Sequence, residues 1–399
     1  MIRFAQFMPF CQIILKKGKE RSVERFHPWI FSGAIQKING IVNNGDIADV
    51  LSSDLKFLGR GYYHNGSIAV RLLSFSEEEI NQDFFNRKIK KAFLLRKNIS
   101  IINSQTNNAY RLVHGEGDEL PGLIIDIYGK HAVIQCHHSG FYRHINKIAL
   151  ALHYVYEDQL VTIFDKSKDT LGKDTEVKEV SFLKGNTESE IICENSHKFE
   201  VNWVTGQKTG FFLDQRDNRK LLGEYAAGKK ILNTFCYSGG FSIYALNNDA
   251  KEVHSLDSSK KAIELTEKNV SINKNPERHV SIVADAIPYM NNLSEKYDII
   301  ILDPPAFAKH QSAKHNAIQA YRRLNEAAMR QINSGGLLFT FSCSQAIDKE
   351  LFRGILFSAA ANSKKQIKIL HQLHQGADHP INIFHPEGEY LKGLVLSIE

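Results

Sequence analysis

The chain has 399 residues, of which 43% are hydrophobic and 24% are charged, and its formal net charge is +6. This length exceeds that of one hydrophobic core and predicts two or three domains. The composition is that of an ordinary globular protein and excludes an intrinsically disordered chain. The mild excess of positive charge suits a polyanionic partner without demanding one.

The five cysteines and the apolar runs exclude several classes of protein. The cysteines are widely spaced, odd in number and form no CxxC pair, which argues against a secreted disulfide scaffold and a zinc site. The short apolar start precedes its charges, an order opposite to that of a signal peptide. No run of 18 apolar residues occurs, so the sequence predicts no transmembrane helix. We therefore expect a cytoplasmic protein with reduced thiols and no membrane partner.

Residues 1–74 form the first predicted domain, a small β-rich unit whose apolar runs are separated by turn signals. Cationic side chains gather near its start, including Lys16 and Lys17, and the aromatic residues Trp29 and Phe31 follow. Cations beside aromatic rings are typical of a surface that binds nucleic acid. The alternative is that Trp29 and Phe31 belong to the core of a small barrel.

Residues 75–190 form the second predicted domain, with an α+β pattern. A helical stretch at 81–99 precedes two strand-like runs, 122–128 and 131–138, which flank a hairpin signal. The loop before the first of these runs carries three carboxylates: Glu116, Asp118 and Glu119. These carboxylates either converge on a metal ion or form a solvated turn, and the sequence leaves both interpretations open.

Residues 191–399 form the third predicted domain, in which strands and helices alternate. The predicted strands cover 229–235, 252–257, 279–285, 297–303 and 336–342. This alternation favours a parallel sheet with helices on both faces. A last strand at 387–399 has no clear crossover helix of its own, so we expect it to run antiparallel.

The residues that end these strands carry the candidate chemistry, because ligands bind at the carboxyl ends of the strands in an open parallel sheet. The first strand is followed by Gly239-Gly240, and the next three end at Asp257, Asp285 and Asp303. Taken singly, the glycines are consistent with a tight structural turn, and each aspartate is consistent with a helix cap. Together, a glycine turn and three aspartates on successive strands favour a nucleoside-type ligand.

Two further motifs lie at the same predicted edge, Asp303-Pro304-Pro305 and Ser342-Cys343-Ser344. The prolines fix the backbone after Asp303, so its carboxylate is held stiffly and can accept hydrogen bonds from a planar base. Cys343 is either a buried strand cysteine or a sulfur nucleophile.

The motifs NTFCYSGGFS, DPPAF and FSCS, together with Asp257 and Asp285, resemble those of class I S-adenosylmethionine-dependent methyltransferases. The segments KTGFFLDQRDNR, ADHP and EGEYLKG are similar to the bacterial 23S rRNA (cytosine-C5) methyltransferase family, and the segment with HPWIFSGAI resembles a PUA domain. The resemblance covers nearly the whole chain in the same domain order. It implies an α/β, Rossmann-like methyltransferase domain with seven strands, preceded by a PUA-like RNA-binding domain and an α+β middle domain.

The resemblance implies S-adenosylmethionine as the cofactor. Asp257 would hold its ribose, Asp285 would accept a hydrogen bond from its adenine amino group, and Arg216 would be a partner for its carboxylate. The residues implied to line the cofactor are Phe212, Asp214, Arg216, Phe235, Tyr237, Ser238, Gly239, Gly240, Asp257, Asp285, Ala286, Asp303 and Pro304.

The resemblance also implies a mechanism. Cytosine C5 becomes nucleophilic after a thiolate adds to C6, so Cys343 is the implied nucleophile, and Asp303 would offset charge on the ring. The cation that helps to ionise this thiol and the base that removes the C5 proton are not identified by the sequence. The expected partner is 23S rRNA or a precursor of the large subunit, and a homodimer is a further option. The residues expected to contact RNA are Pro305, Phe307, Lys16, Lys17 and Trp29.

One departure from the family pattern leaves other functions open. Ala306 and Phe307 follow the prolines, where many RNA 5-methylcytosine enzymes have a second cysteine. Methylation of guanine or adenine is therefore the first alternative, and a non-catalytic RNA-binding or ribosome-assembly factor is the second. A nicotinamide dehydrogenase is disfavoured, because the GxGxxG fingerprint is missing. Four irregularly spaced histidines are expected to be structural or to contact RNA rather than to bind a metal: His371, His374, His379 and His385.

Overall fold

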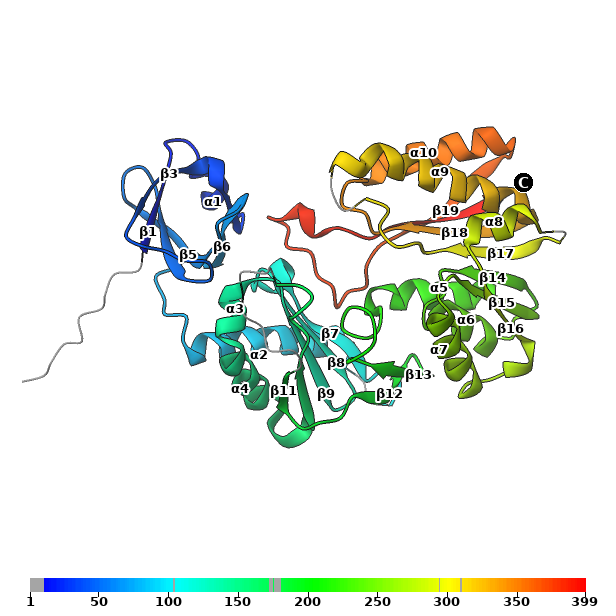
Figure 1. Ribbon diagram of the computed structural model, residues 1–399, viewed down its shortest axis with the longest axis horizontal. Coiled ribbons are helices and arrows are strands. Elements are labelled where there is room, and N and C mark those ends of the chain that lie inside the picture. The colour runs from blue at the N-terminus through cyan, green and yellow to red at the C-terminus, as the bar shows by residue number, and fades with distance from the viewer. Residues whose placement is uncertain (1–10, 103–104, 172–174, 176–180, 294, 309–310) are drawn as a thin grey trace, which may run out of the picture. The chain divides into compact units, whose positions relative to one another are not determined.

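The computed structural model describes residues 11–102, 105–171, 175, 181–293, 295–308 and 311–399 (Figure 1). The chain divides into two compact units. The first unit comprises Met1–Ile102, Tyr110–Glu188 and Asp378–Gly388, and the second comprises Asn103–Ala109, Ser189–Ala377 and Glu389–Glu399. The change of unit between Glu188 and Ser189 lies close to the expected boundary after residue 190, while the division into three domains stays a prediction.

A six-stranded sheet forms the amino-terminal part of the first unit, in the order β2-β6-β5-β4-β1-β3. Its strands are β1 (Cys11–Leu15), β2 (Trp29–Phe31), β3 (Ile35–Asn39), β4 (Ile47–Leu51), β5 (Phe57–Tyr63) and β6 (Ile68–Ser74). The short helix α1 (Arg21–Glu24) precedes β2. Apolar side chains at alternate positions, such as Ile13, Leu15 and Val50, face a common core. The β-rich fold expected for this segment is therefore confirmed.

A five-stranded sheet with helices forms a second part of the first unit, which also includes the segment Asp378–Gly388. Its strands, in the order β11-β10-β9-β8-β7, are β7 (Ala109–His114), β8 (Leu123–Tyr128), β9 (His131–Cys136), β10 (Thr162–Asp165) and β11 (Ser181–Lys184). The helices are α2 (Gln82–Asn98), α3 (Ser139–Arg143) and α4 (Ile145–Tyr156). Helix α2 begins at Asn81, whose side chain accepts a hydrogen bond from the Phe84 amide. The predicted hairpin joins β8 and β9.

The three carboxylates of the loop at 115–122 have different partners. Asp118 forms a buried ion pair with Arg96. Glu119 contacts Lys88 and Lys91, which lower its pKa to about 2 although burial acts to raise it. The third carboxylate, that of Glu116, accepts a hydrogen bond of 2.9 Å from the indole of Trp29. The three side chains therefore do not converge on a shared metal position.

A seven-stranded sheet forms the centre of the second unit, in the order β16-β15-β14-β17-β18-β20-β19 (Figure 1). Its strands are β14 (Lys230–Thr234), β15 (Glu252–Asp257), β16 (His279–Val283), β17 (Tyr297–Leu302), β18 (Ile332–Ser342), β19 (Ile367–Leu373) and β20 (Lys392–Ile398). Strands β14 to β18 run parallel, so their carboxyl ends meet at one edge. Strand β20 pairs antiparallel with β18 and β19, as expected for the last strand.

Six helices accompany the sheet of the second unit: α5 (Arg216–Tyr225), α6 (Gly240–Asn247), α7 (Lys260–Ser271), α8 (Ala286–Asn291), α9 (Lys314–Gln331) and α10 (Lys349–Ser363). Helices α8, α9 and α10 share one hydrophobic core with β17 and β18. A hairpin of β12 (Ser189–Glu194) and β13 (His197–Asn202) precedes them. Among the described residues, no helix combines the length and the hydrophobicity that crossing a bilayer requires.

Candidate functional site

The turn between β14 and α6 contains an unusual run of left-handed backbone. Phe235, Tyr237 and Gly239 have φ angles of 56°, 49° and 75°. Strain of this kind at non-glycine residues persists where the surroundings hold it, and it is frequent at ligand sites. A Cβ on Gly239 would lie 2.8 Å from Thr266, and one on Gly240 would lie 3.0 Å from Arg219. The two glycines therefore allow close packing of protein against the turn, which favours the interpretation as a tight structural turn for each glycine taken singly.

The two aspartates that end β15 and β16 differ in their surroundings. Asp257 accepts hydrogen bonds from the amides of Tyr237, at 3.1 Å, and Ser259, at 2.9 Å, so it braces both neighbouring turns. Asp285 is exposed and precedes α8, yet its side chain makes no capping hydrogen bond. The capping alternative therefore does not apply to Asp285, whose carboxylate faces solvent next to the buried Ala286.

Two arginines of the predicted cofactor segment are held by one buried carboxylate. Arg219 forms a two-pronged contact with Glu194, at 2.9 and 2.8 Å, and donates to the Phe212 carbonyl at 2.9 Å. Arg216 lies 3.5 Å from the same carboxylate and donates to the Ala109 carbonyl at 2.7 Å. The Arg216 guanidinium thus has partners within the fold, and its role toward the carboxylate of the cofactor stays a prediction.

Replacing Arg219 with methionine should destabilise the second unit by about 3 kcal/mol, because Glu194 would lose its two-pronged partner inside the protein. The free energy of unfolding from urea titrations checks this, with the exposed neighbour Lys220→Met as the control. Equal stability of the two variants would show that Arg216 alone compensates the Glu194 charge.

Asp214 and Asp303 form an acidic pair at the carboxyl edge of the sheet. Burial and the charge of Asp214 raise the pKa of Asp303 to about 7. The Oδ2 atom of Asp214 accepts a hydrogen bond of 2.6 Å from Tyr390, while its buried Oδ1 atom has no partner. A buried acceptor without a partner fits a ligand that brings a cationic donor, such as the α-ammonium of S-adenosylmethionine.

Cys343 follows β18 at the same edge. Burial, Asp303 and Asp214 raise the pKa of its thiol to about 11, and Lys392 acts in the opposite direction. Lys392 begins β20 directly across from Ser342, is only 5% exposed and donates to the Ser344 carbonyl at 2.8 Å. Its own pKa falls to about 8, chiefly because it is buried. Lys392 is therefore the cation next to this thiol that the sequence did not identify.

The two prolines after Asp303 lead into a packed loop. Pro304 is buried and Pro305 is exposed, while the ring of Phe307 packs 4.7 Å from that of Tyr321. Tyr321 in turn lies within hydrogen-bond distance of Ser344, at 3.1 Å. The loop after the prolines is thus tied to the segment that carries Cys343, and Pro305 alone of the two prolines is open to a large substrate.

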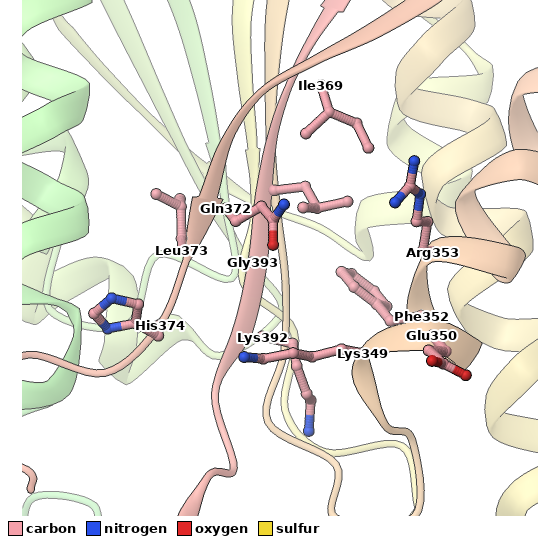
Figure 2. A pocket seen from close by; sticks show the side chains of 11 residues that line it. Lys349, Glu350, Phe352, Arg353, Ile369, Gln372, Leu373, His374, Lys392 and Gly393 are labelled. Carbon is pink, nitrogen blue, oxygen red and sulfur yellow. The ribbon is translucent and has the colours of Figure 1, made fainter. Parts of the chain in front are cut away.

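A pocket of about 220 Å³ opens between the start of α10 and the ends of β19 and β20. Figure 2 shows Lys349, Arg353 and Lys392 among the side chains around it. Lys392 therefore borders both this pocket and the segment of Cys343. Lys349 is paired with Glu389 at 2.5 Å. The cationic lining suits a phosphate or another anionic group.

The residues expected to contact RNA in the first unit lie at its surface. Lys16 and Lys17 are exposed, and Lys16 donates to the Gly33 carbonyl at 2.9 Å. Trp29 is only partly buried, and Phe31 remains 47% exposed. The alternative that both aromatic side chains belong to a barrel core does not hold for Phe31.

The four histidines of the carboxyl-terminal part have different partners. His371 bonds to the Tyr225 hydroxyl at 2.8 Å, and His374 lies 2.7 Å from the Gln375 carbonyl oxygen. His379 contacts Asp378, while the ring of His385 packs against Trp29. These four residues do not form one ligand set.

Known proteins resemble both units. Residues 13–75 match the family model of the PUA-like domain, and residues 176–381 match that of the S-adenosylmethionine-dependent methyltransferases. A relative from Shewanella frigidimarina named ribosomal RNA large subunit methyltransferase I is 38% identical over 397 residues, which cover 97% of this chain and 99% of the relative.

Solved structures share the fold over nearly the whole chain. A protein from Streptococcus mutans, assigned as a SAM-dependent methyltransferase, matches with a TM-score of 0.83 and 23% identity, over 97% of this chain and 99% of its own. Another structure, of an assigned methyltransferase complexed with SAH, matches with a TM-score of 0.84 and 24% identity, over the same shares of both chains. The chain therefore belongs to the family of S-adenosylmethionine-dependent methyltransferases, and proteins named ribosomal RNA large subunit methyltransferase I are its full-length relatives.

Proposed function

We propose that this protein transfers a methyl group from S-adenosylmethionine to C5 of a cytosine in 23S rRNA, acting in the cytoplasm on the RNA or on a precursor of the large subunit. The relatives are named for large-subunit ribosomal RNA, which supports the class of substrate. The observation that carries the choice of cytosine C5 is the thiol of Cys343 beside Asp303 and Lys392. A homodimer and the three-domain division 1–74, 75–190 and 191–399 stay predictions.

The residues that would hold the cofactor lie along the carboxyl edge of the sheet. Asp214 would offer its unpartnered acceptor to the methionine end, Asp257 would hold the ribose, and the exposed Asp285 would accept from the adenine amino group. Phe212 and Tyr237 pack together at 5.3 Å beside the turn and suit the same ligand. S-adenosylmethionine, when bound, supplies an electrophilic methyl group.

Cys343 would start the reaction at cytosine C6. A bond forms between its sulfur and C6, and the electron pair of the C5=C6 double bond becomes available at C5 for the methyl group. The proton then leaves C5, its bonding electrons restore the double bond, and the C6–S bond breaks to release the thiolate. The cycle thus consumes one methyl donor, releases one proton and regenerates Cys343.

The thiol needs help to ionise, because in the protein it stays protonated at neutral pH. Asp303 and Asp214 oppose the thiolate, and the Lys392 ammonium favours it. Lys392 is buried and is fixed by its hydrogen bond to the Ser344 carbonyl, so its charge acts on the thiol in a medium of low dielectric constant, where water screens it little. We assign Lys392 as the residue that stabilises the thiolate.

Replacing Lys392 with glutamine should slow methylation about 10-fold or more at pH 7.5, because the thiolate of Cys343 would lose its positive neighbour. Alkylation of Cys343 by iodoacetamide, followed across pH by peptide mass spectrometry, should shift to higher pH by about one unit. Lys392→Arg should retain most of the reactivity. Lys349→Gln, at the same pocket, is the control, and an unchanged alkylation profile in Lys392→Gln would refute this role.

Asp303 would act on the base itself. A carboxyl with a pKa of about 7 is partly protonated at neutral pH, so it can share a proton with the cytosine ring and offset charge after thiolate addition. The rigid prolines that follow hold its direction. RNA would be held by exposed Pro305, by the packed Phe307, and by Lys16, Lys17 and Trp29 of the first unit.

Methylation with S-adenosylmethionine and unmodified 23S rRNA, followed by nucleoside mass spectrometry, tests the proposed function. We expect a new peak of 5-methylcytidine. A methylated purine would favour the guanine or adenine alternative and end the thiolate mechanism. Binding of RNA without any methylation of RNA or subunits would favour a non-catalytic assembly factor.

A further inference from the structure

We propose that the first unit binds one zinc ion through His27, His385 and Glu387. The three side chains come from near opposite ends of the chain and belong to the same compact unit. One ligand atom from each lies within 4.8 Å of the others. The three residues belong to a different unit from Cys343, and the proposal does not depend on the proposed methylation.

The distances fit a metal of tetrahedral geometry. His27 Nε2 lies 3.5 Å from Glu387 Oε1, and His385 Nε2 lies 3.7 Å from Glu387 Oε2. Ligand atoms at about 2.0–2.1 Å from a zinc ion in a tetrahedron lie about 3.3–3.4 Å from one another. Each histidine is thus within a few tenths of an ångström of this spacing from a different carboxylate oxygen, and one ligand atom from each of the three residues lies within 4.8 Å of the others. Two imidazoles and one carboxylate favour zinc over magnesium or calcium, which prefer oxygen ligands.

The buried imidazole of His385 gives an independent reason for a ligand. It is only 2% exposed, and neither of its ring nitrogens has a hydrogen-bond partner. A buried polar ring normally satisfies both nitrogens, so a missing partner at this position calls for an ion or a donor. Its neighbours otherwise include the ring of Trp29, at 4.3 Å, which supplies packing and no acceptor.

The backbone around the other two ligands orients them toward the same point. His27 Nδ1 lies 3.3 Å from the Trp29 carbonyl oxygen and 3.2 Å from the Trp29 amide nitrogen. The Trp29 amide donates to Nδ1, which fixes the ring with Nε2 3.5 Å from Glu387 Oε1, and a metal bound at Nε2 would take the place of the proton on that nitrogen. Glu387 lies in the short helical turn Pro386–Gly388 directly after His385 and points one oxygen at each histidine.

The ion would fasten the returning segment 378–388 to the amino-terminal sheet. Trp29 already contacts Glu116 and His385 there, and Phe26 packs 5.3 Å from Phe384. A metal that joins residues so distant in sequence restricts the unfolded chain strongly. Zinc binding should therefore raise the melting temperature of the first unit.

The test uses the full chain, purified without a histidine tag and stripped with EDTA, titrated with Zn²⁺ against a chromophoric chelator. We expect the chain to bind one Zn²⁺. His385→Phe and the substitution Glu387→Gln, at an exposed residue, should each weaken the affinity for Zn²⁺ at least about 100-fold. The control variant His153→Phe, on α4, should bind Zn²⁺ as the wild type does. Substitution with Co²⁺ should give the intense visible bands of a four-coordinate ion. S-adenosylmethionine binding, unchanged in all variants, shows that the second unit remains folded.

Two results would overturn the proposal. The first is that the wild-type chain binds no more Zn²⁺ than the His385→Phe variant does. The other is uptake of one ion that Cys343→Ala removes while Glu387→Gln leaves it intact, which would place the metal at the thiol.

Discussion

Replacing Cys343 with alanine should reduce methyl transfer by at least about 1000-fold, because the attack on C6 would have no nucleophile. S-adenosylmethionine should still bind within a factor of about three, since Cys343 lies beside the substrate base in this account and not under the cofactor. Single-turnover methylation of 23S rRNA, with calorimetric titration of the cofactor, measures both quantities.

Cys236 is the matched control for Cys343. It lies at the glycine turn, where burial raises the pKa of its thiol to about 12 and its sulfur lies 3.5 Å from the Thr266 hydroxyl. Cys236→Ala should therefore keep most of the activity. Substantial activity in Cys343→Ala or Cys343→Ser would point instead to methylation of an amine or a ring nitrogen of a purine.

Replacing Asp303 with asparagine should have opposite effects on activity and stability. Methylation should fall about 100-fold or more, because asparagine cannot share a proton with the base. The free energy of unfolding at pH 8 should rise by about 2–4 kcal/mol, because the folded state no longer has to bury a negative charge beside Asp214.

The sign of the pH dependence follows from the raised pKa of Asp303. The folded protein keeps this proton up to about pH 7, whereas the unfolded chain releases it near pH 4. The folded state therefore binds more protons in this range, and the free energy of unfolding falls as pH rises from about 4 to 7. Melting temperatures between pH 5 and 8 should decline more steeply in the wild type than in Asp303→Asn. An equal decline would contradict the buried charge, and the exposed Asp217→Asn is the control.

Much of the fold could be predicted because its signals are local. Alternating strands and helices, turn residues and the missing crossover before 387–399 predict a parallel sheet with an antiparallel last strand, as the structure has it. The same pattern identified Asp303 and Cys343 at the ends of strands that prove to be neighbours, β17 and β18.

The contacts that the sequence did not predict depend on pairings between distant segments. Lys392 faces Ser342 only through the register of β20 on β18, and no local pattern reports a register. Its one signal was its place at the start of a final strand, in EGEYLKG. The contact of Arg216 with Glu194 could not be predicted from the sequence, because Glu194 lies on the preceding hairpin of β12 and β13. The histidine cluster escaped notice for the same reason, since His385 joins His27 rather than its sequence neighbours.

RNA in which cytidine is replaced by 5-fluorocytidine traps the bond between Cys343 and cytosine C6. Fluorine at C5 cannot leave as the proton does, so the C6–S bond should persist after methyl transfer. We expect an RNA–protein adduct that survives SDS, requires S-adenosylmethionine and maps by mass spectrometry to Cys343. Formation of the adduct by Cys343→Ala, or methylation of normal RNA without any adduct on the fluorinated RNA, would exclude Cys343 as the nucleophile.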